Sequence, residues 1–178
     1  AVKGANLLPH IFKAVWSSLP RVRFELIGQD TRRSKGTSWT EWILDRVPCA
    51  FRPQIVIRGG VPYEQVAEYL APHSVACFAS VCENLPYATM ECMSMGMACV
   101  VASGGGAREL GEDGISLLLA PRNAEAIASS LVRLLRDPSL RARIAREGQR
   151  RVESEYHPIQ ISQRMEQIYE LAKCRAQY

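Results

Sequence analysis

Short apolar runs alternate with helical patterns over the first two-thirds of the chain, and this alternation constrains the fold more than any other feature. The runs are four or five residues long, too short for helices, and most end at a glycine or a polar residue. A strand pairs with a parallel neighbour only after a crossover of helical length, so the alternation predicts a parallel sheet. The expected strands cover residues 23–27, 54–57, 75–79, 98–102 and 115–119.

The helical patterns fall into two groups, those that connect the strands and those that end the chain. Near-continuous apolar strands are typical of a sheet that is covered on both faces. We therefore expect an α/β fold, a Rossmann-like doubly wound parallel sheet with C-terminal helices. The connecting helices are expected at 5–18, 39–47, from Pro62 onward and at 86–95, and the terminal ones at 123–136, 138–154 and 158–173.

The composition excludes several classes of protein. Of the 178 residues, 47% are hydrophobic and 22% are charged, which is typical of a globular domain and not of a disordered chain. The net charge of +4 is too small to indicate a nucleic-acid partner. No uncharged apolar run reaches about 18 residues, so we expect no membrane span. Cys77 and Cys99 lie in apolar runs, where we expect buried reduced thiols and hence a cytoplasmic protein.

Open parallel sheets bind ligands at the carboxyl ends of their strands. The loop that follows the third expected strand is the most informative one there. Asn84 is a candidate N-cap and Pro86 suits the first turn of the next helix, whose free N–H groups form an anion site suited to phosphate. Glu83 lies just before this helix. Glu91 lies inside it among apolar neighbours.

The environment and spacing of the two carboxylates suggest their use. A carboxylate among apolar neighbours costs free energy unless it is paired, so we interpret Glu91 as a ligand-binding residue, with a solvent-facing position as the alternative. From Leu85 to Glu91 a helix rises roughly 9 Å, which exceeds the roughly 5–5.5 Å between the carboxyls of a retaining glycosidase. The spacing suits two groups that hold opposite ends of an elongated ligand, such as a sugar and a ribose joined by phosphates.

Glu83 and Glu91, with seven residues between them, closely resemble the signature of retaining GT-B glycosyltransferases of family four, the glycosyl transferases group 1. Lys3-Gly4 and the segments 24–28, 105–110 and 112–114 resemble further family segments in matching order. The resemblance spans essentially residues 3–173. It implies that residues 1–178 are one half of a GT-B fold, a nucleotide-sugar-binding domain without its first strand and without the N-terminal acceptor domain.

The resemblance also implies roles for individual residues. Lys3 and Glu83 are the implied catalytic residues: Lys3 neutralises the leaving diphosphate and Glu83 contacts hydroxyls of the transferred sugar. Glu91 is implied to bind the ribose hydroxyls. The other implied donor-binding residues are Gly28, Arg58 and Val61 near the base, and Asn84, Leu85 and Tyr87 at the diphosphate.

The implied substrate is a nucleotide sugar, with UDP favoured over GDP or ADP. The implied reaction is retaining glycosyl transfer to a glycan or lipid-linked acceptor, with no metal or other cofactor. By itself the fragment is expected to be inactive. By family analogy the setting is polysaccharide biosynthesis, in the cytoplasm or peripherally at the inner face of the membrane.

Two other functions stay open at this point. A nucleotide-sugar 2-epimerase shares the GT-B fold, and a non-catalytic sugar-nucleotide-binding module would also use such a domain. A basic series in the tail, Arg136, Arg143 and Arg150 at seven-residue spacing, is interpreted as a solvated face, with contact to a membrane surface as the alternative. Trp39 and Trp42 are interpreted as a packing face, with contact to a base or to the N-terminal domain as the alternative.

Overall fold

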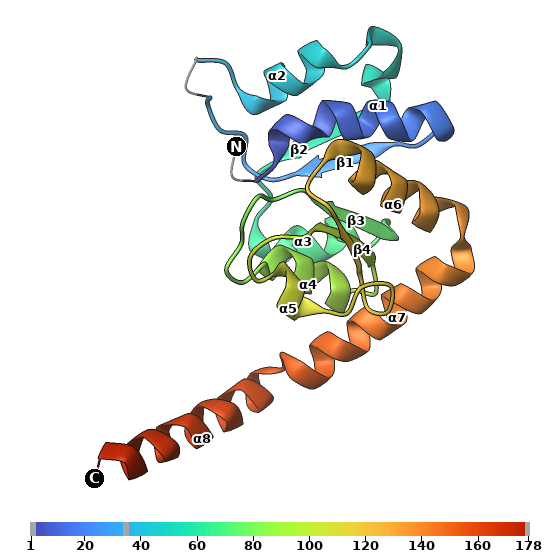
Figure 1. Ribbon diagram of the computed structural model, residues 1–178. Coiled ribbons are helices and arrows are strands. Elements are labelled where there is room, and N and C mark those ends of the chain that lie inside the picture. The colour runs from blue at the N-terminus through green and yellow to red at the C-terminus, as the bar shows by residue number, and fades with distance from the viewer. Residues whose placement is uncertain (1–2, 34–35, 177–178) are drawn as a thin grey trace.

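The five strands found among the described residues pair only in parallel (Figure 1). The structure is a computed structural model that describes residues 3–33 and 36–176, with side chains up to Lys173. The observed pairing confirms the expected α/β class. One sheet joins β1 (Phe24–Ile27) to β2 (Ile55–Gly59), and the other has the order β3 (Val75–Phe78), β4 (Ala98–Ala102) and β5 (Leu118–Ala120).

The single continuous sheet that we expected is divided into two. Within the described residues β1 pairs only with β2, and β3 pairs only with β4 on one of its edges. Both sheets still contribute to one hydrophobic core, because Phe24 of β1 and Val75 of β3 pack against the same buried cluster. Cys77, at the middle of β3, is exposed and not buried as expected, whereas Cys99 on β4 is buried.

Helices cover both faces of the three-stranded sheet (Figure 1). Successive side chains of a strand point to opposite faces, so Val100 of β4 packs toward α1 and α6 while Val101 packs toward α4 and α5. All five residues of β4 are buried. The helices are η1 (Ala5–Leu7), α1 (Leu8–Ser18), α2 (Trp39–Arg46), η2 (Cys49–Gln54), α3 (Tyr63–Leu70), α4 (Tyr87–Ser94), α5 (Ala107–Leu110), α6 (Ala124–Arg136), α7 (Pro138–Glu155) and α8 (Pro158–Ala176).

Local sequence explains where several helices begin. Ser38 and Glu41 form a reciprocal capping box at α2. The side chain of Asn123 accepts a hydrogen bond at the start of α6, and that of Asp137 does the same for α7. Pro138 then occupies the first turn of α7, where the missing N–H costs nothing. These starts agree with the sequence prediction to within one residue.

The last strand begins later than expected. Residues 114–116 form a turn in which the Ser116 hydroxyl accepts a hydrogen bond from the Glu112 N–H at 2.9 Å, and Gly114 adopts a positive φ of 74°. Leu117 forms only an isolated bridge with Asp113. Leu118 is therefore the first residue of β5.

The helix α8 extends away from the sheets (Figure 1). Every described side chain on it is exposed. Ile161, Met165 and Ile168 share one face at helical spacing and form an apolar stripe without a partner in the described part of the chain. No helix among the described residues combines the length and the apolar character that crossing a membrane requires.

Candidate functional site

A cavity of about 190 Å³ lies where β3 and β4 end and α4 begins. Its walls include four of the nine residues predicted from the sequence, namely Lys3, Glu83, Leu85 and Tyr87. The position agrees with the rule that open parallel sheets bind ligands at the carboxyl ends of their strands. The other wall residues are Phe78, Ser80, Pro86, Ala88, Thr89, Val101, Ala102, Gly104 and Ala107.

The charged centre of the cavity is an ion pair. The Lys3 ammonium donates to the Glu83 carboxylate at 2.6 Å, and the Ser80 hydroxyl donates to the same oxygen at 2.8 Å. The side chain of Glu83 is only 22% exposed, whereas that of Lys3 is 74% exposed. Burial by itself raises the pKa of Glu83, but the two hydrogen bonds and the charge of Lys3 together hold this pKa below its ordinary value. Glu83 is therefore an ionised acceptor at neutral pH.

The loop that carries Glu83 rests on a run of three glycines. The Gly106 N–H donates to the Glu83 carbonyl oxygen at 2.7 Å. A Cβ on Gly106 would collide with the carbonyl oxygen of Asn84, and one on Gly105 with that of Glu83. Arg122 adds a hydrogen bond of 2.9 Å to the carbonyl oxygen of Val81. The glycines thus allow two backbone segments to touch, and this contact positions Glu83.

The helix α4 starts at Tyr87 with Pro86 as its N-cap, and no side chain caps it. The prediction that Asn84 is the N-cap is wrong, because the backbone of residues 84–86 stays non-helical against the glycine run. The Tyr87 N–H donates to the Leu85 carbonyl oxygen at 3.0 Å, and the Thr89 N–H donates to that of Pro86 at 3.0 Å. The Ala88 N–H finds no acceptor among residues 3–33 and 36–176. It is the amide of this turn that is left free for an anion.

Glu91 lies on α4 but outside the cavity wall. Its carboxylate is half-buried and makes no hydrogen bond within the described residues, while its carbonyl oxygen accepts from Ser94 and Met95. Because α4 begins at Tyr87, the helical rise to Glu91 is about 6 Å and the rest of the separation from Glu83 is loop. The two carboxylates still flank the start of the helix.

The remaining predicted residues lie at the ends of β1 and β2, away from the cavity wall. The Gly28 N–H donates to the Gly59 carbonyl oxygen at 2.8 Å, and Val61 follows β2 half-buried. The Arg58 side chain turns back to Glu25, with Nε at 2.6 Å from the carboxylate. The Nε of Arg58 is therefore engaged within the fold.

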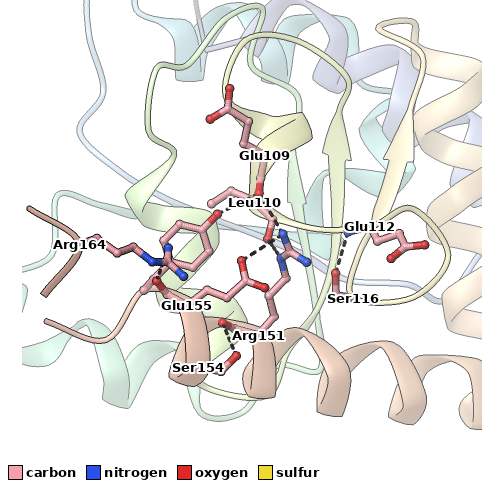
Figure 2. A network of polar contacts seen from close by, with 9 residues as sticks. Glu109, Leu110, Glu112, Ser116, Arg151, Ser154, Glu155 and Arg164 are labelled. Atoms are coloured by element: carbon pink, nitrogen blue, oxygen red, sulfur yellow. Dashed lines mark hydrogen bonds and ion pairs between the residues drawn. The ribbon is translucent and has the colours of Figure 1, made fainter. Parts of the chain in front are cut away.

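The short helix α5, which follows the glycine run, is held by α7 (Figure 2). Arg151 Nε donates to the Leu110 carbonyl oxygen at 2.8 Å, and the Tyr156 hydroxyl donates to that of Glu109 at 2.9 Å. Arg151 also pairs with Glu155 at 3.3 Å. These contacts satisfy carbonyl groups at the end of α5 and join the tail to the loop that supports Glu83.

The basic series of the tail is engaged within the molecule. Arg136 donates to the Ser18 carbonyl oxygen and Arg143 to that of Gly114, at 3.2 and 3.0 Å. Arg150 pairs with Glu147 at 2.9 Å. These contacts favour a structural role over a membrane surface. Trp39 and Trp42 stack edge to face with Arg33 over both rings, as expected of a packing face.

Sequence reasoning missed two polar residues of the cavity wall. Ser80 lies in the same loop as Glu83, and its spacing of three residues from Glu83 is the signal that could have identified it. Thr89 gave no such signal, because a threonine inside an apolar helix resembles a small packing residue. Across the described residues no three side chains of His, Cys, Asp or Glu converge as a metal site requires.

The comparisons with known proteins decide the family. Residues 1–137 match the family model described as glycosyl transferases group 1. The chain belongs to this family. No curated protein sequence matches this chain.

Solved structures of longer proteins share the fold of this glycosyltransferase domain. Sucrose-phosphate synthase from Thermosynechococcus elongatus matches 98% of the chain at 22% identity with a TM-score of 0.80, over 43% of its own length. Anabaena HepE in complex with UDP matches 95% at 20% identity with a TM-score of 0.82, over 45% of its own length. The chain thus spans less than half of either protein.

A third structure is itself a single domain. The C-terminal domain of LpcC, a glycosyl transferase group 1 protein from Francisella tularensis, matches 88% of the chain at 20% identity with a TM-score of 0.74, over 81% of its own length. The fold of this chain is therefore that of the C-terminal, Rossmann-like half of a GT-B glycosyltransferase.

Proposed function

We propose that this domain binds a nucleotide diphosphate sugar as the donor for retaining, metal-independent glycosyl transfer to a glycan or lipid-linked acceptor. The observation that carries the proposal is the Lys3–Glu83 ion pair in a cavity at the start of α4. A cation, a free helix amide and an ionised carboxylate meet there within one small space. This is the set of groups that a sugar diphosphate needs.

Each group has a chemical task. Lys3 and the Ala88 N–H bind the diphosphate, and the positive end of α4 adds to their effect. The same charges stabilise the negative charge that grows on the diphosphate as the glycosidic bond breaks. Glu83, held ionised by Lys3 and Ser80, accepts hydrogen bonds from hydroxyls of the transferred sugar and orients it.

The nucleoside lies toward the other end of α4 and the edge of β2. Glu91 is half-buried and lacks a hydrogen-bond partner among the described residues, so its carboxylate is available to two ribose hydroxyls. The backbone from Arg58 to Val61 borders the base. HepE, which shares the fold, has been solved with UDP and with UDP-glucose, and on that basis we place UDP before GDP and ADP.

We further propose that an acceptor-binding domain and one more strand complete the enzyme. The facing edges of β1 and β3 lack partners in the described part of the chain, and exposed Cys77 lies on one of them. A parallel strand between them would join the two sheets into one. The exposed apolar stripe of α8 supports a second packing partner, which we take to be the acceptor domain. We expect this enzyme to act in polysaccharide biosynthesis at the cytoplasmic side of the membrane.

The proposal is tested by adding UDP-glucose to the ¹⁵N-labelled domain and following its amide spectrum. We expect the largest shifts at Glu83, Ala88 and the residues around Gly59, and none along α6. Shifts confined to α6 or α8 would contradict the proposed site. No contact within the described residues specifically favours the epimerase or the non-catalytic module.

A further inference from the structure

The Thr89 hydroxyl is buried without a partner. The residue has no exposed surface, and its Oγ1 makes no hydrogen bond within the described residues. A buried hydroxyl without a partner lowers the stability of the folded state, because it has lost its water and gained nothing in return. Such groups are uncommon in native structures, and each calls for an explanation.

The start of α4 explains why the hydroxyl is free. Thr89 is the third residue of the helix, the position from which a Glu or Gln side chain bonds back to the N-cap N–H in a capping box. Here the N-cap is Pro86, which has no N–H. The N-cap N–H, which would be a local partner, is therefore absent.

Thr89 also forms part of the cavity wall, beside Ala88 and with Lys3 on the same cavity. The Ala88 N–H is free and the Thr89 hydroxyl is free, so two adjacent donors of one helical turn lack acceptors in the described part of the chain. The Lys3 ammonium adds a positive charge at the same cavity. The cavity wall thus carries three donors suited to an anionic oxygen, with the Glu83 carboxylate as the present partner of Lys3.

We propose that the Thr89 hydroxyl donates a hydrogen bond to a diphosphate oxygen of the bound nucleotide sugar, next to the Ala88 N–H. This inference rests on the proposed function and assigns to Thr89 a binding role that the sequence did not indicate. Because no part of the hydroxyl is open to water, the first turn of α4 must relax slightly when the ligand enters. The hydroxyl then gains its first partner and has no bound water to lose.

The test uses Thr89→Val, which replaces the hydroxyl by a methyl group of similar size, with Thr89→Ser as the matched control that keeps the hydroxyl. Two quantities are measured, the melting temperature without ligand and the Kd for UDP by calorimetry, with uridine as the phosphate-free probe. If UDP does not bind the wild-type domain, GDP with guanosine and ADP with adenosine take its place.

We expect Thr89→Val to melt at the same temperature as wild type or higher, because an unpaired buried hydroxyl has been removed. We expect its Kd for UDP to rise on the order of tenfold, since a hydrogen bond to a charged group is lost. The affinity of Thr89→Val for uridine should stay close to that of wild type. The affinity of Thr89→Ser for UDP should also stay close to that of wild type. A structural hydroxyl would produce the opposite pattern, a lower melting temperature with unchanged UDP affinity.

The results distinguish a failure of the role of Thr89 from a failure of the proposed function. Three results for Thr89→Val would overturn the role of Thr89 and leave the donor site intact. They are an unchanged affinity for UDP, an equal loss of affinity for UDP and uridine, and a clear fall in melting temperature. If none of the three nucleotides binds the wild-type domain, the proposed function fails and this inference fails with it.

Discussion

The Lys3 ammonium lies 2.6 Å from the Glu83 carboxylate, although eighty residues separate the two in the chain. The fold brings them together because residues 3 and 4 pass the end of β3, where the Gly4 backbone touches Ala79. Glu83 follows the same strand end. The proposed site assigns the phosphates to Lys3 and the sugar to Glu83, and this contact puts the two groups side by side on the wall of one cavity.

Lys3→Met should raise the pKa of Glu83. In wild type this pKa lies below its ordinary value, because hydrogen bonds and the charge of Lys3 outweigh burial. A depressed folded-state pKa means that the stabilisation by the pair is present above the pKa of the unfolded chain and is lost as pH falls through the lower folded-state pKa. A ¹³C NMR titration of the Glu83 carboxyl measures the shift. Lys13→Met, an exposed lysine on α1, is the control, and equal pKa values in both variants would contradict the pair.

Gly106→Ala should displace the loop that carries Glu83. The new Cβ would collide with the Asn84 carbonyl oxygen, and backbone must move to accept it. We expect a loss of stability of roughly 1–3 kcal/mol, as for other overpacked sites, and weaker nucleotide binding. Thermal melting and calorimetry check both effects. Gly60→Ala is the control for melting, since its Cβ would meet only Gln29 at 3.9 Å; similar melting of the two variants would refute the close contact.

Arg151→Met should destabilise the domain more than Arg150→Met. Arg151 donates to the Leu110 carbonyl oxygen (Figure 2) and is only 29% exposed. Arg150 is 72% exposed and pairs at the surface with Glu147. Hydrogen bonds of charged groups contribute about 1.5–3 kcal/mol, and exposed ion pairs about 0–1 kcal/mol. Urea denaturation gives the free energy of unfolding for each variant. Equal losses would show that α5 does not depend on α7.

Glu91→Ala should weaken the binding of UDP and of uridine alike. The carboxylate is assigned to the ribose, which both probes contain, and a hydrogen bond to a charged group contributes about 1.5–3 kcal/mol. This pattern differs from that of Thr89→Val, which should spare uridine. Calorimetry with the two probes separates the nucleoside end from the phosphate end, and unchanged affinities would remove Glu91 from the site.

The sequence predicted most strands and helices because their signals are local. Ser38, Asn123 and Asp137 cap the helices that they were expected to precede or start. Asn84 does not cap α4, because the contact of its backbone with Gly106 is tertiary and leaves no mark on the local pattern. Cys77 shows the same limit, since an apolar run does not reveal which strand edge lacks a neighbour.

The site was predictable only in part for a related reason. The pattern of Glu83 and Glu91 around a helix start indicated the loop at which the cavity lies, although only Glu83 of the two lines it. The contact between Lys3 and Glu83 depends on chain paths eighty residues apart, which spacing does not encode. Thr89 was missed because its isolation follows from a neighbour without an N–H, Pro86, and from burial.

The central claim is that the cavity around Lys3 and Glu83 binds a nucleoside diphosphate. Calorimetric titration of UDP, GDP and ADP into the domain tests it most directly, with Lys3→Met measured beside wild type. We predict that one nucleotide binds in preference to the others. We also predict that Lys3→Met raises the Kd of that nucleotide roughly tenfold, because a charge-assisted contact is lost. No heat with any of the three at millimolar concentration, or equal binding by Lys3→Met, would contradict the claim.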